Sequence, residues 1–438
     1  MQAGRSRRWG RVLGVLVSPV LVVPALAAPA SAAATVLYVD DGSGCSDKGS
    51  GTTSKPFCTI GKGASVATAG QTVQVAAGTY SGSITVGKSG TSSEPVTLAG
   101  APGAMLTSSG VGITVSGKSW VVIRGFEVGP TGSDGIRVTG GSSHVTVVGN
   151  NVHDAGTRSS GKTANGIDVS GTTTDSTIDG NVVHDNSDSG IYVSGSAHRI
   201  LVVGNETYGN ARGYTRAAPG IDIRATDNTV RGNYSHHNED SGVQVRGGAD
   251  RTVVVGNRTD HNGDHGIDVL DSQDCVLVGN SVFKNVTAGI NDEGTSPGVT
   301  IKNNISVDNG IDSPRTSGNI RVDKNSYSGS VVDSNLTFLS TKSADYVWNG
   351  KSYSSLAAFK LATGQEARGI QADPKWRNAA AGDLRLLAGS PAIDSADSGA
   401  PEQLARDIDG VARADDPATR NTGIGPRSYD DRGAYEFR

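Results

Sequence analysis

The segments Gly166-Ile167-Asp168-Val169, Gly220-Ile221-Asp222-Ile223 and Gly266-Ile267-Asp268-Val269 share one pattern, in which a glycine precedes an aliphatic residue, a variable residue and a second aliphatic residue. The first aliphatic residue stands at positions 113, 136, 167, 191, 221, 243, 267 and 290, so successive copies lie 23, 31, 24, 30, 22, 24 and 23 residues apart. A recurring period of this length is the signature of a repeat protein. We therefore predict an array of repeats over residues 111–337.

A second pattern, a Gly-Asn pair after a run of β-branched residues, recurs with the same period. Its asparagines are Asn150, Asn181, Asn205, Asn233, Asn257 and Asn280, and most copies carry another asparagine five residues later, as at Asn186, Asn210, Asn238, Asn262 and Asn285. The alternating residues between these turns predict short strands and leave no room for a long helix. One coil of a parallel β-helix fits, with strands about 4.8 Å apart and asparagines hydrogen-bonded along the axis. The predicted fold class is all-β.

The chain divides into four predicted parts. Residues 1–32 have an arginine-rich start, an apolar stretch and the small residues Ala30-Ser31-Ala32, which together predict a secretory signal peptide and an extracellular protein without a membrane anchor. Residues 33–110 are predicted to form an N-terminal cap and the first coils, with a short helix at 59–69 that covers the open end of the core. The repeats occupy 111–337, and 338–438 are predicted to form an irregular C-terminal cap with a short helix at 354–362.

The net charge limits the classes of partner. The formal charge is −4, and loss of the four arginines of the signal peptide, which contains no acidic residue, makes it −8. This net negative charge argues against nucleic-acid binding. Cys45 and Cys58 are close together in the exported part of the chain and predict a disulfide, whereas Cys275 occupies a core position and is predicted to be buried.

The variable position of the first pattern must face outward, because the aliphatic residues on either side of it fill the core. Stacked coils align these positions into an outward column, which reads Arg137, Asp168, Tyr192, Asp222, Gln244, Asp268 and Asn291. A second outward column, two residues later, reads Thr139, Ser170, Ser194, Arg224, Arg246, Leu270 and Glu293. We predict that these columns line a groove, with Asp168, Tyr192 and Gln244 in contact with a substrate.

Two repeats are longer than the others, and both insertions fall at the same point of the coil. They span residues 155–164 and 211–219, and the second contains Arg212, Tyr214 and Arg216. Insertions at one point of a solenoid emerge on one side, often the binding side. We predict that these three residues contact the substrate; the alternative is that surface loops lengthen at little entropic cost.

Charged residues meet on neighbouring coils of the groove. Arg224 above Arg246 predicts a site for a planar anion such as a carboxylate or a sulfate. Asp240 above Asp264, with Asp268 nearby, predicts a Ca²⁺ site, because hard oxygen ligands suit this ion. Together these residues predict a groove for an acidic polysaccharide.

Two other interpretations of these charges remain open. The two columns could neutralise each other, with Arg224 paired to Asp222 and Arg246 paired to Asp268, and exposed pairs of this kind stabilise little. The nearby histidines are predicted to be solvated turn residues rather than zinc ligands; they are His236, His237, His261 and His265.

The coils resemble the right-handed parallel β-helix proteins of the pectate-lyase type, and a few short sequence segments resemble polysaccharide lyase family 9. Val182–Val193 is similar to the stretch that carries the family's Asp-Asp-Gly-x-Asp calcium motif, and Asp264-His265-Gly266-Ile267-Asp268 keeps the first and last acids of that motif. The resemblance implies calcium-assisted β-elimination of an acidic, uronate-containing polysaccharide. The family's base is a lysine; no variable position here is lysine, so Arg224 and Arg246 are the predicted base or carboxylate clamp.

Two other classes of function remain open. Asp222 and Asp268 lie two coils apart, about 9–10 Å, which is near the spacing of the acid and base of an inverting glycoside hydrolase. The third possibility is a non-catalytic solenoid that binds glycans or cell-envelope polymers, because fold does not determine function. In each case we predict a monomeric protein.

Overall fold

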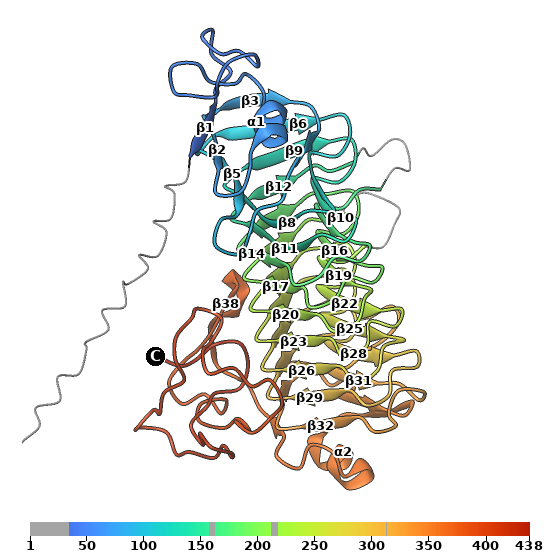
Figure 1. The fold of residues 1–438 in the computed structure, drawn as a ribbon. Coiled ribbons are helices and arrows are strands. Elements are labelled where there is room, and N and C mark those ends of the chain that lie inside the picture. The colour runs from blue at the N-terminus through green and yellow to red at the C-terminus, as the bar shows by residue number, and fades with distance from the viewer. Residues whose placement is uncertain (1–34, 157–162, 212–217, 312) are drawn as a thin grey trace, which may run out of the picture. The chain divides into compact units, whose positions relative to one another are not determined.

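The computed structural model describes residues 35–156, 163–211, 218–311 and 313–438. Their strands stack into three 12-stranded sheets, which we name sheets I, II and III, plus one two-stranded hairpin (Figure 1). Neighbouring strands are parallel throughout the three sheets except for the final pair of sheet III. The prediction of an all-β parallel β-helix is confirmed.

Sheet I contains the strands that precede the Gly-Asn turns. Its strands are β1 (Val36–Val39), β2 (Thr72–Val75), β5 (Val96–Gly100), β8 (Ser119–Arg124), β11 (Ser143–Val148), β14 (Thr177–Asp179), β17 (Leu201–Val203), β20 (Thr229–Arg231), β23 (Val253–Val255), β26 (Val276–Val278), β29 (Thr300–Lys302) and β32 (Val331–Asp333).

Sheet II contains the strands between the two asparagine turns. Its strands are β3 (Gly78–Ser81), β6 (Ala104–Ser108), β9 (Glu127–Thr131), β12 (Asn151–His153), β15 (Val182–His184), β18 (Glu206–Tyr208), β21 (Tyr234–His236), β24 (Arg258–Asp260), β27 (Ser281–Phe283), β30 (Ile305–Val307), β33 (Leu336–Phe338) and β36 (Ile370–Gln371).

Sheet III contains the strands that follow the repeated glycine and carries the predicted groove. Its strands are β4 (Ile84–Thr85), β7 (Ile113–Ser116), β10 (Ile136–Thr139), β13 (Ile167–Val169), β16 (Ile191–Val193), β19 (Ile221–Ile223), β22 (Val243–Arg246), β25 (Ile267–Leu270), β28 (Ile290–Glu293), β31 (Ile320–Val322), β34 (Tyr346–Trp348) and β35 (Lys351–Tyr353).

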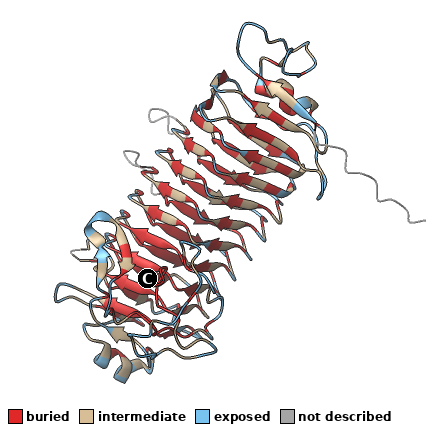
Figure 2. Ribbon diagram, turned by 90° about the vertical axis from the view of Figure 1, so that its left-hand side faces the viewer, coloured by how far each residue is buried: buried red, intermediate tan, exposed pale blue. Residues whose placement is uncertain are grey.

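The core is a continuous column of aliphatic side chains between the three sheets. Figure 2 colours the buried residues red along the stacked strands. Two asparagine columns turn the corners between strands. The first is Asn150, Asn181, Asn205, Asn233, Asn257, Asn280, Asn304 and Asn335, and the second is Asn186, Asn210, Asn238, Asn262, Asn285, Asn309 and Asn319; all are buried. In the first column each Nδ2 donates to the next Oδ1 at 2.9–3.1 Å. These bonds satisfy polar groups that would otherwise be buried unpaired.

Helices close both ends of the core. Helix α1 (Ile60–Val66) begins at the N-cap Thr59 and packs on β1, β2 and β4. Helix α2 (Leu356–Thr363) packs on β34 and β35, and its buried Phe359 stacks on Tyr346 with ring centroids 4.4 Å apart. Both helices lie where the sequence predicted them.

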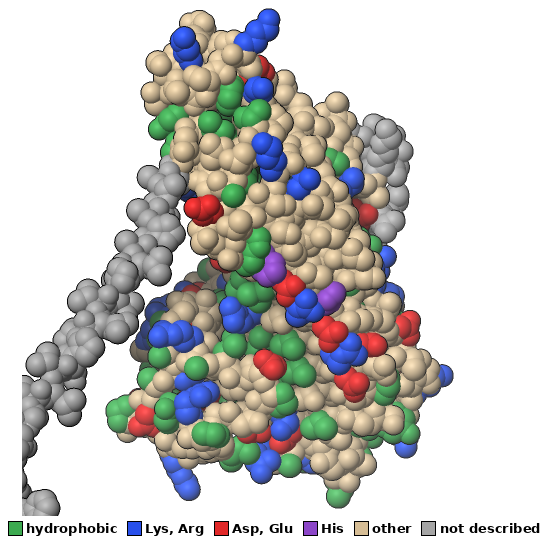
Figure 3. All heavy atoms as spheres, viewed as in Figure 1, with side chains coloured by type: hydrophobic (Ala, Val, Ile, Leu, Met, Phe, Trp, Pro, Cys, Tyr) green, Lys and Arg blue, Asp and Glu red, His purple; other side chains and the backbone are tan. Residues whose placement is uncertain are grey.

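The C-terminal tail follows α2 and contains the hairpin of β37 (Trp376–Asn378) and β38 (Asp383–Leu386), joined by a 3₁₀ turn, η1 (Ala379–Ala381). It contacts the coils through specific bonds: Arg432 Nη1 donates to the Asn335 carbonyl at 2.7 Å, and Lys302 pairs with Asp397 at 3.1 Å. On the face drawn in Figure 3, acidic and basic side chains are interspersed.

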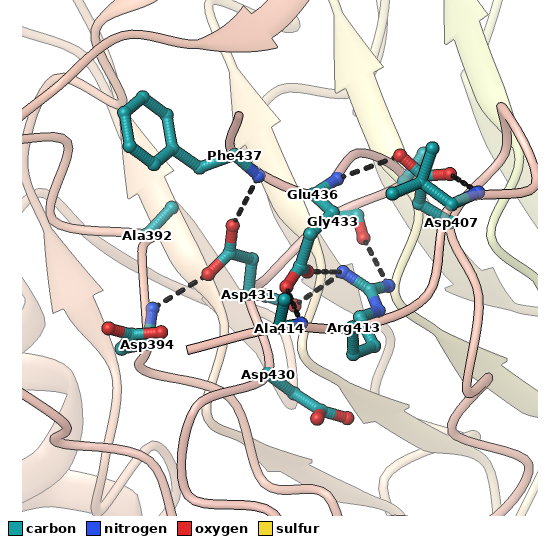
Figure 4. Close-up of polar contacts among 12 residues, drawn as sticks. Ala392, Asp394, Asp407, Arg413, Ala414, Asp430, Asp431, Gly433, Glu436 and Phe437 are labelled. Atoms are coloured by element: carbon teal, nitrogen blue, oxygen red, sulfur yellow. Dashed lines mark hydrogen bonds and ion pairs between the residues drawn. The ribbon is translucent and has the colours of Figure 1, made fainter. Parts of the chain in front are cut away.

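Buried carboxylates organise this tail, as Figure 4 shows. Asp431 accepts hydrogen bonds from the backbone N–H groups of Asp394 and Phe437, each at 2.7 Å, and Glu436 pairs with Arg413 at 2.8 Å. Burial and the neighbouring Glu436 raise the pKa of Asp431 to about 8. Asp431 therefore joins distant parts of the tail rather than one local turn.

The cysteines lie as predicted. Cys45 and Cys58 form a disulfide, and Cys275 is free and buried. Burial raises the pKa of the Cys275 thiol to about 12, so it stays protonated at neutral pH. Within the described ranges, no helix is long and apolar enough to cross a membrane.

Candidate functional site

The outward column of sheet III has the predicted register. Strand pairing aligns Arg137, Asp168, Tyr192, Asp222, Gln244, Asp268, Asn291 and Arg321 in successive strands. The repeated glycine lies next to the core at each turn: a Cβ at Gly166 would lie 2.3 Å from Val183 Cγ1, so no larger residue fits. Glycine fixes the close approach of the chain, and the aliphatic alternation then turns the variable residue outward.

A polar cavity of about 240 Å³ lies over the first coils of this column. Its lining residues are Ser133, Asp134, Arg137, Thr163, Asn165, Asp168, Asp188, Tyr192 and Arg224. Three predicted residues, Asp168, Tyr192 and Arg224, are therefore brought together in one cavity. Gln244, Arg246 and Asp222 do not line it.

Asp168 is the buried carboxyl group of this cavity. Its Oδ2 accepts from Arg137 Nε at 3.2 Å and from the Ser170 hydroxyl at 3.3 Å, whereas its Oδ1 has no hydrogen-bond partner. Arg137 also bonds Asp134, with Nε–Oδ2 2.8 Å. Burial and, second, the charge of Asp134 raise the pKa of Asp168 to about 7. A carboxyl group that titrates near neutrality suits acid–base catalysis.

Asp222 is enclosed by two arginines. It is 0% exposed and accepts from Arg224 Nε at 3.0 Å and from Arg246 Nη2 at 2.7 Å. Arg224 pairs with Asp222 as the neutralising interpretation expected, but Arg246 also pairs with Asp222 rather than with Asp268. The Arg224 guanidinium carbon lies 5.1 Å from the centre of the Tyr192 ring, and 32% of the Arg224 side chain is exposed.

The predicted calcium ligands are already engaged by hydrogen-bond donors. Asp268 accepts from Gln244 Nε2 at 2.8 Å and from Asn291 Nδ2 at 2.7 Å, and burial raises its pKa to about 6. Asp264 accepts from Thr287 at 2.5 Å and pairs with Arg315.

Asp240, the third predicted ligand, accepts from the Ser241 N–H at 2.7 Å, and burial and Asp264 raise its pKa. In the described part of the chain, the one group of three His, Cys, Asp or Glu residues with ligand atoms all within 4.8 Å of one another is His265, Asp268 and Glu293.

Sequence reasoning missed several of these residues. His265 was expected to be a solvated turn residue; this is wrong, because it is only 2% exposed. Asp134, which lines the cavity and bonds Arg137, went unnoticed. The predicted substrate contacts Arg212, Tyr214 and Arg216 lie outside the described residues.

Comparison with known families identifies the class of this chain. A family model described as "Right handed beta helix region" matches residues 83–207 and 166–352, so the chain belongs to the right-handed β-helix family. A second model, described only as a protein of unknown function, matches residues 43–87. No curated protein matches the sequence.

Several solved structures are similar to this chain. Pectate lyase Pel9A is 18% identical over 92% of this chain and 96% of its own, with a TM-score of 0.58. The Dettilon tailspike protein (gp208) is 12% identical over 70% of this chain and 62% of its own, with a TM-score of 0.50. An alginate lyase from Paenibacillus sp. str. FPU-7 is 18% identical over 66% of this chain and 91% of its own, with a TM-score of 0.39. At these identities the likeness to Pel9A and to the tailspike protein concerns the fold alone.

Proposed function

We propose that this protein is an exported enzyme that cleaves an acidic, uronate-containing polysaccharide by β-elimination in the sheet III cavity. One observation carries the proposal: the cavity joins Asp168, whose pKa is about 7, to the guanidinium groups of Arg137 and Arg224 and to Tyr192. A solved pectate lyase has the same fold, which is consistent with this chemistry.

The arginines of the cavity bind the substrate carboxylate. Arg224 is held by Asp222 and by the face of Tyr192, so its planar fork is already oriented before a ligand arrives. An arginine beside a uronate carboxylate stabilises the negative charge that spreads onto it when the C5 proton leaves. Asp222 is then a positioning residue, since it is buried, pairs with Arg224 and Arg246, and does not line the cavity.

Asp168 and Tyr192 carry the proton transfers. The ionised carboxylate of Asp168, which lines the cavity, takes the C5 proton; the C5–H electron pair forms the C4–C5 double bond, and the bond from C4 to the glycosidic oxygen breaks. The Tyr192 hydroxyl donates its proton to that leaving oxygen, and solvent exchange restores both groups. We assign the base to Asp168 rather than to an arginine, because guanidinium stays protonated in proteins.

Calcium is not part of the proposed mechanism. The donors around Asp240, Asp264 and Asp268 already occupy much of their carboxylate surface, and the three carboxylates are not a convergent ligand group among the described residues. These residues as arranged therefore do not fit a calcium site, and no step of the mechanism depends on one.

The alternative function is that of a glycoside hydrolase, and the carboxyl groups of the cavity support it. Asp134, Asp168 and Asp188 all line the cavity, and a carboxyl group with a raised pKa beside other carboxylates suits the acid of a hydrolase. Asp222 and Asp268, the pair suggested by the sequence, are both buried and do not line it.

Product analysis separates the possibilities. The whole protein is incubated with pectate, alginate and glycosaminoglycans, with Ca²⁺ and with chelator, while ultraviolet absorbance and reducing ends are measured. An unsaturated, ultraviolet-absorbing product supports the lyase. New reducing ends without absorbance show a hydrolase, and binding without any product shows a non-catalytic solenoid; both contradict the proposal.

A further inference from the structure

Sheet II and the C-terminal tail enclose two neighbouring cavities, which share no residue with the sheet III cavity. The first has a volume of about 330 Å³ and lies between the ends of strands β27, β30 and β33 and the hairpin that begins at Trp376. The second, of about 460 Å³, shares Phe338 with the first. Volumes of this size are typical of sites for small molecules. We propose that these two cavities, which we name the sheet II groove, bind a short segment of an acidic polysaccharide.

The outward column of sheet II begins as a stack of rings. Strand pairing aligns His153, His184, Tyr208, His236, Asp260, Phe283, Val307 and Phe338 in successive strands. From His153 to His236 the ring centroids lie 5.2, 4.7 and 5.2 Å apart, with the rings stacked face to face. These rings pack on one another, so that part of the column is complete by itself.

A valine interrupts the aromatic residues farther along the same column. Val307 lies between Phe283 and Phe338, whose strands are two spacings, about 10 Å, apart. All three side chains line the first cavity, and so does Trp376, whose ring packs edge-on against Phe283 with centroids 5.3 Å apart. The smaller valine therefore leaves an apolar slot between two aromatic residues. Apolar walls with a few polar groups are the usual lining of a ligand site.

Three lysines give the groove positive charge. Lys284 and Lys375 line the first cavity, Lys342 lines the second, and all three are exposed. Among the described residues Lys302 is the one lysine in an ion pair, so these three ammonium groups have no carboxylate partner there. The Lys284 ammonium lies 5.2 Å from the centre of the Phe283 ring, beside the slot. A ligand with both a negative charge and an apolar face complements this arrangement.

The two carboxylates of the groove are engaged by backbone groups. Asp308 accepts from the Ser340 N–H at 2.7 Å, and Asp373 accepts from the Lys375 N–H at 2.8 Å. The groove therefore has three cationic and two anionic lining side chains, in a chain whose formal charge is −4. A local excess of positive charge of this kind attracts an anionic ligand to one place on an acidic protein.

These features together select an acidic sugar. A uronate has a carboxylate for the lysines and ring C–H groups for the apolar slot, whereas a neutral sugar would leave the ammonium groups without a counter-charge. The choice of a uronate polymer rests on the proposed function. The groove itself does not depend on cleavage, because it lies on a different sheet from Asp168, so its test uses binding rather than turnover.

Tryptophan fluorescence of the whole protein reports on the groove, because Trp376 lines it. The Asp168→Asn protein, in which cleavage is blocked, is titrated with tri-galacturonate, with tri-mannuronate and with neutral maltotriose. We expect at least one acidic trisaccharide to change the emission and maltotriose to leave it unchanged. Trp376→Phe should remove the emission change, while calorimetry shows that most of the affinity remains, because phenylalanine keeps an apolar wall.

Two variants of the groove should weaken binding of the acidic trisaccharide. Val307→Phe completes the aromatic column and fills the slot, and Lys284→Gln combined with Lys375→Gln removes the charges. Each should raise Kd by at least about 10-fold, the size expected when a contact with a charged group is lost. Lys351→Gln is the matched control, because Lys351 is also an exposed lysine but lines neither cavity.

Several results would overturn the proposal: maltotriose that binds as tightly as the acidic trisaccharides, an emission that no acidic trisaccharide changes, or an affinity that both groove variants leave unchanged. Equal loss in Lys351→Gln would show a general effect of charge and overturn it as well. Binding that Arg224→Gln abolishes and Val307→Phe leaves intact would place the ligand in the sheet III cavity instead. Failure of the proposed function gives a different result, in which no polymer is cleaved but the Trp376 signal remains.

Discussion

The asparagine columns and the outward column of sheet III repeat with the same period but differ in chemistry. Each asparagine of the first column occupies the same position in its coil, is buried and bonds to the next asparagine. The outward column changes residue at almost every strand, and two of its buried members, Asp168 and Gln244, keep an oxygen without a partner. Positions that repeat therefore stabilise the fold, and the varying positions of sheet III are where we propose that a ligand binds.

The largest expected effect is on activity and concerns the outward column of sheet III. Asp168→Asn removes the proposed base and should lower kcat by about 1000-fold, within the range for general acid–base groups. Because the pKa of Asp168 is about 7 and the ionised form is active, kcat/KM of the native protein should rise with pH through about 7. Steady-state kinetics across pH measures both.

A matched variant tests the specificity of that effect. Asp179→Asn makes the same change on sheet I of the same coil and should leave kcat unchanged. Comparable loss in both variants, or a rate that falls as pH rises through 7, would rule out Asp168 as the base.

The next largest effect is on stability and concerns the first asparagine column. Asn257→Ala deletes an amide that accepts from Asn233 and donates to Val230, Val255 and Asn280. Several buried groups lose their partners, so the free energy of unfolding should fall by about 3 kcal/mol. Denaturant titration measures it, with Asn151→Ala on the outer surface of sheet II as the control. Equal losses in the two variants would show that the column has no special role.

A smaller change in the free energy of unfolding, of opposite sign, is expected where an aspartate occupies a core position. Asp292 takes the place of the second aliphatic residue, is 0% exposed, and has no hydrogen bond to either carboxylate oxygen. Asp292→Val should raise the free energy of unfolding by about 2 kcal/mol, because an unpaired buried polar group is removed.

The pH dependence of this gain has a definite sign. Burial and the nearby Asp268 raise the pKa of Asp292 from 3.8 to about 9, so between these values the folded chain holds a proton that the unfolded chain releases. The native protein loses stability as pH rises through this window, and the advantage of Asp292→Val grows with it. Thermal unfolding at pH values across the window checks this; an advantage independent of pH would contradict the assignment.

The smallest expected effect is at Arg246, which contacts Asp222 but not the cavity. Arg246→Lys keeps the charge but loses the planar fork, so Arg224 becomes less firmly oriented and KM should rise by about 3-fold with kcat nearly unchanged. Arg224→Lys, at the cavity itself, should raise KM more. The reverse order would place the carboxylate site at Arg246.

The sequence predicted the fold because the fold depends on repeated local features. The alternation around Ile167 and Ile221 and the recurring asparagines specified the strands, the turns and the inward and outward columns. Which side chains meet across those columns was harder to predict. Arg246 is long enough to pair with Asp222 or with Asp268, and the choice depends on three-dimensional distances that the spacing does not contain.

The burial of His265 shows a second limit of sequence reasoning. A histidine beside a turn glycine is usually solvated, but here Thr287 and Ala288 of the next coil cover it. Arg315 similarly reaches Asp264 from a distant part of the chain. Contacts of this kind depend on how the coils stack and on which side chains the next coil presents. The sequence therefore predicted which residues lie on sheet III, but not which of them meet in the cavity.

The most direct test of the account compares the native protein with Asp168→Asn on acidic polysaccharides, by the ultraviolet absorbance of the unsaturated product. We predict that absorbance rises with the native protein on at least one uronate polymer and is nearly abolished in the variant, which should still unfold cooperatively. Absorbance that Asp168→Asn leaves unchanged would contradict the proposed site, and reducing ends without absorbance would contradict β-elimination itself.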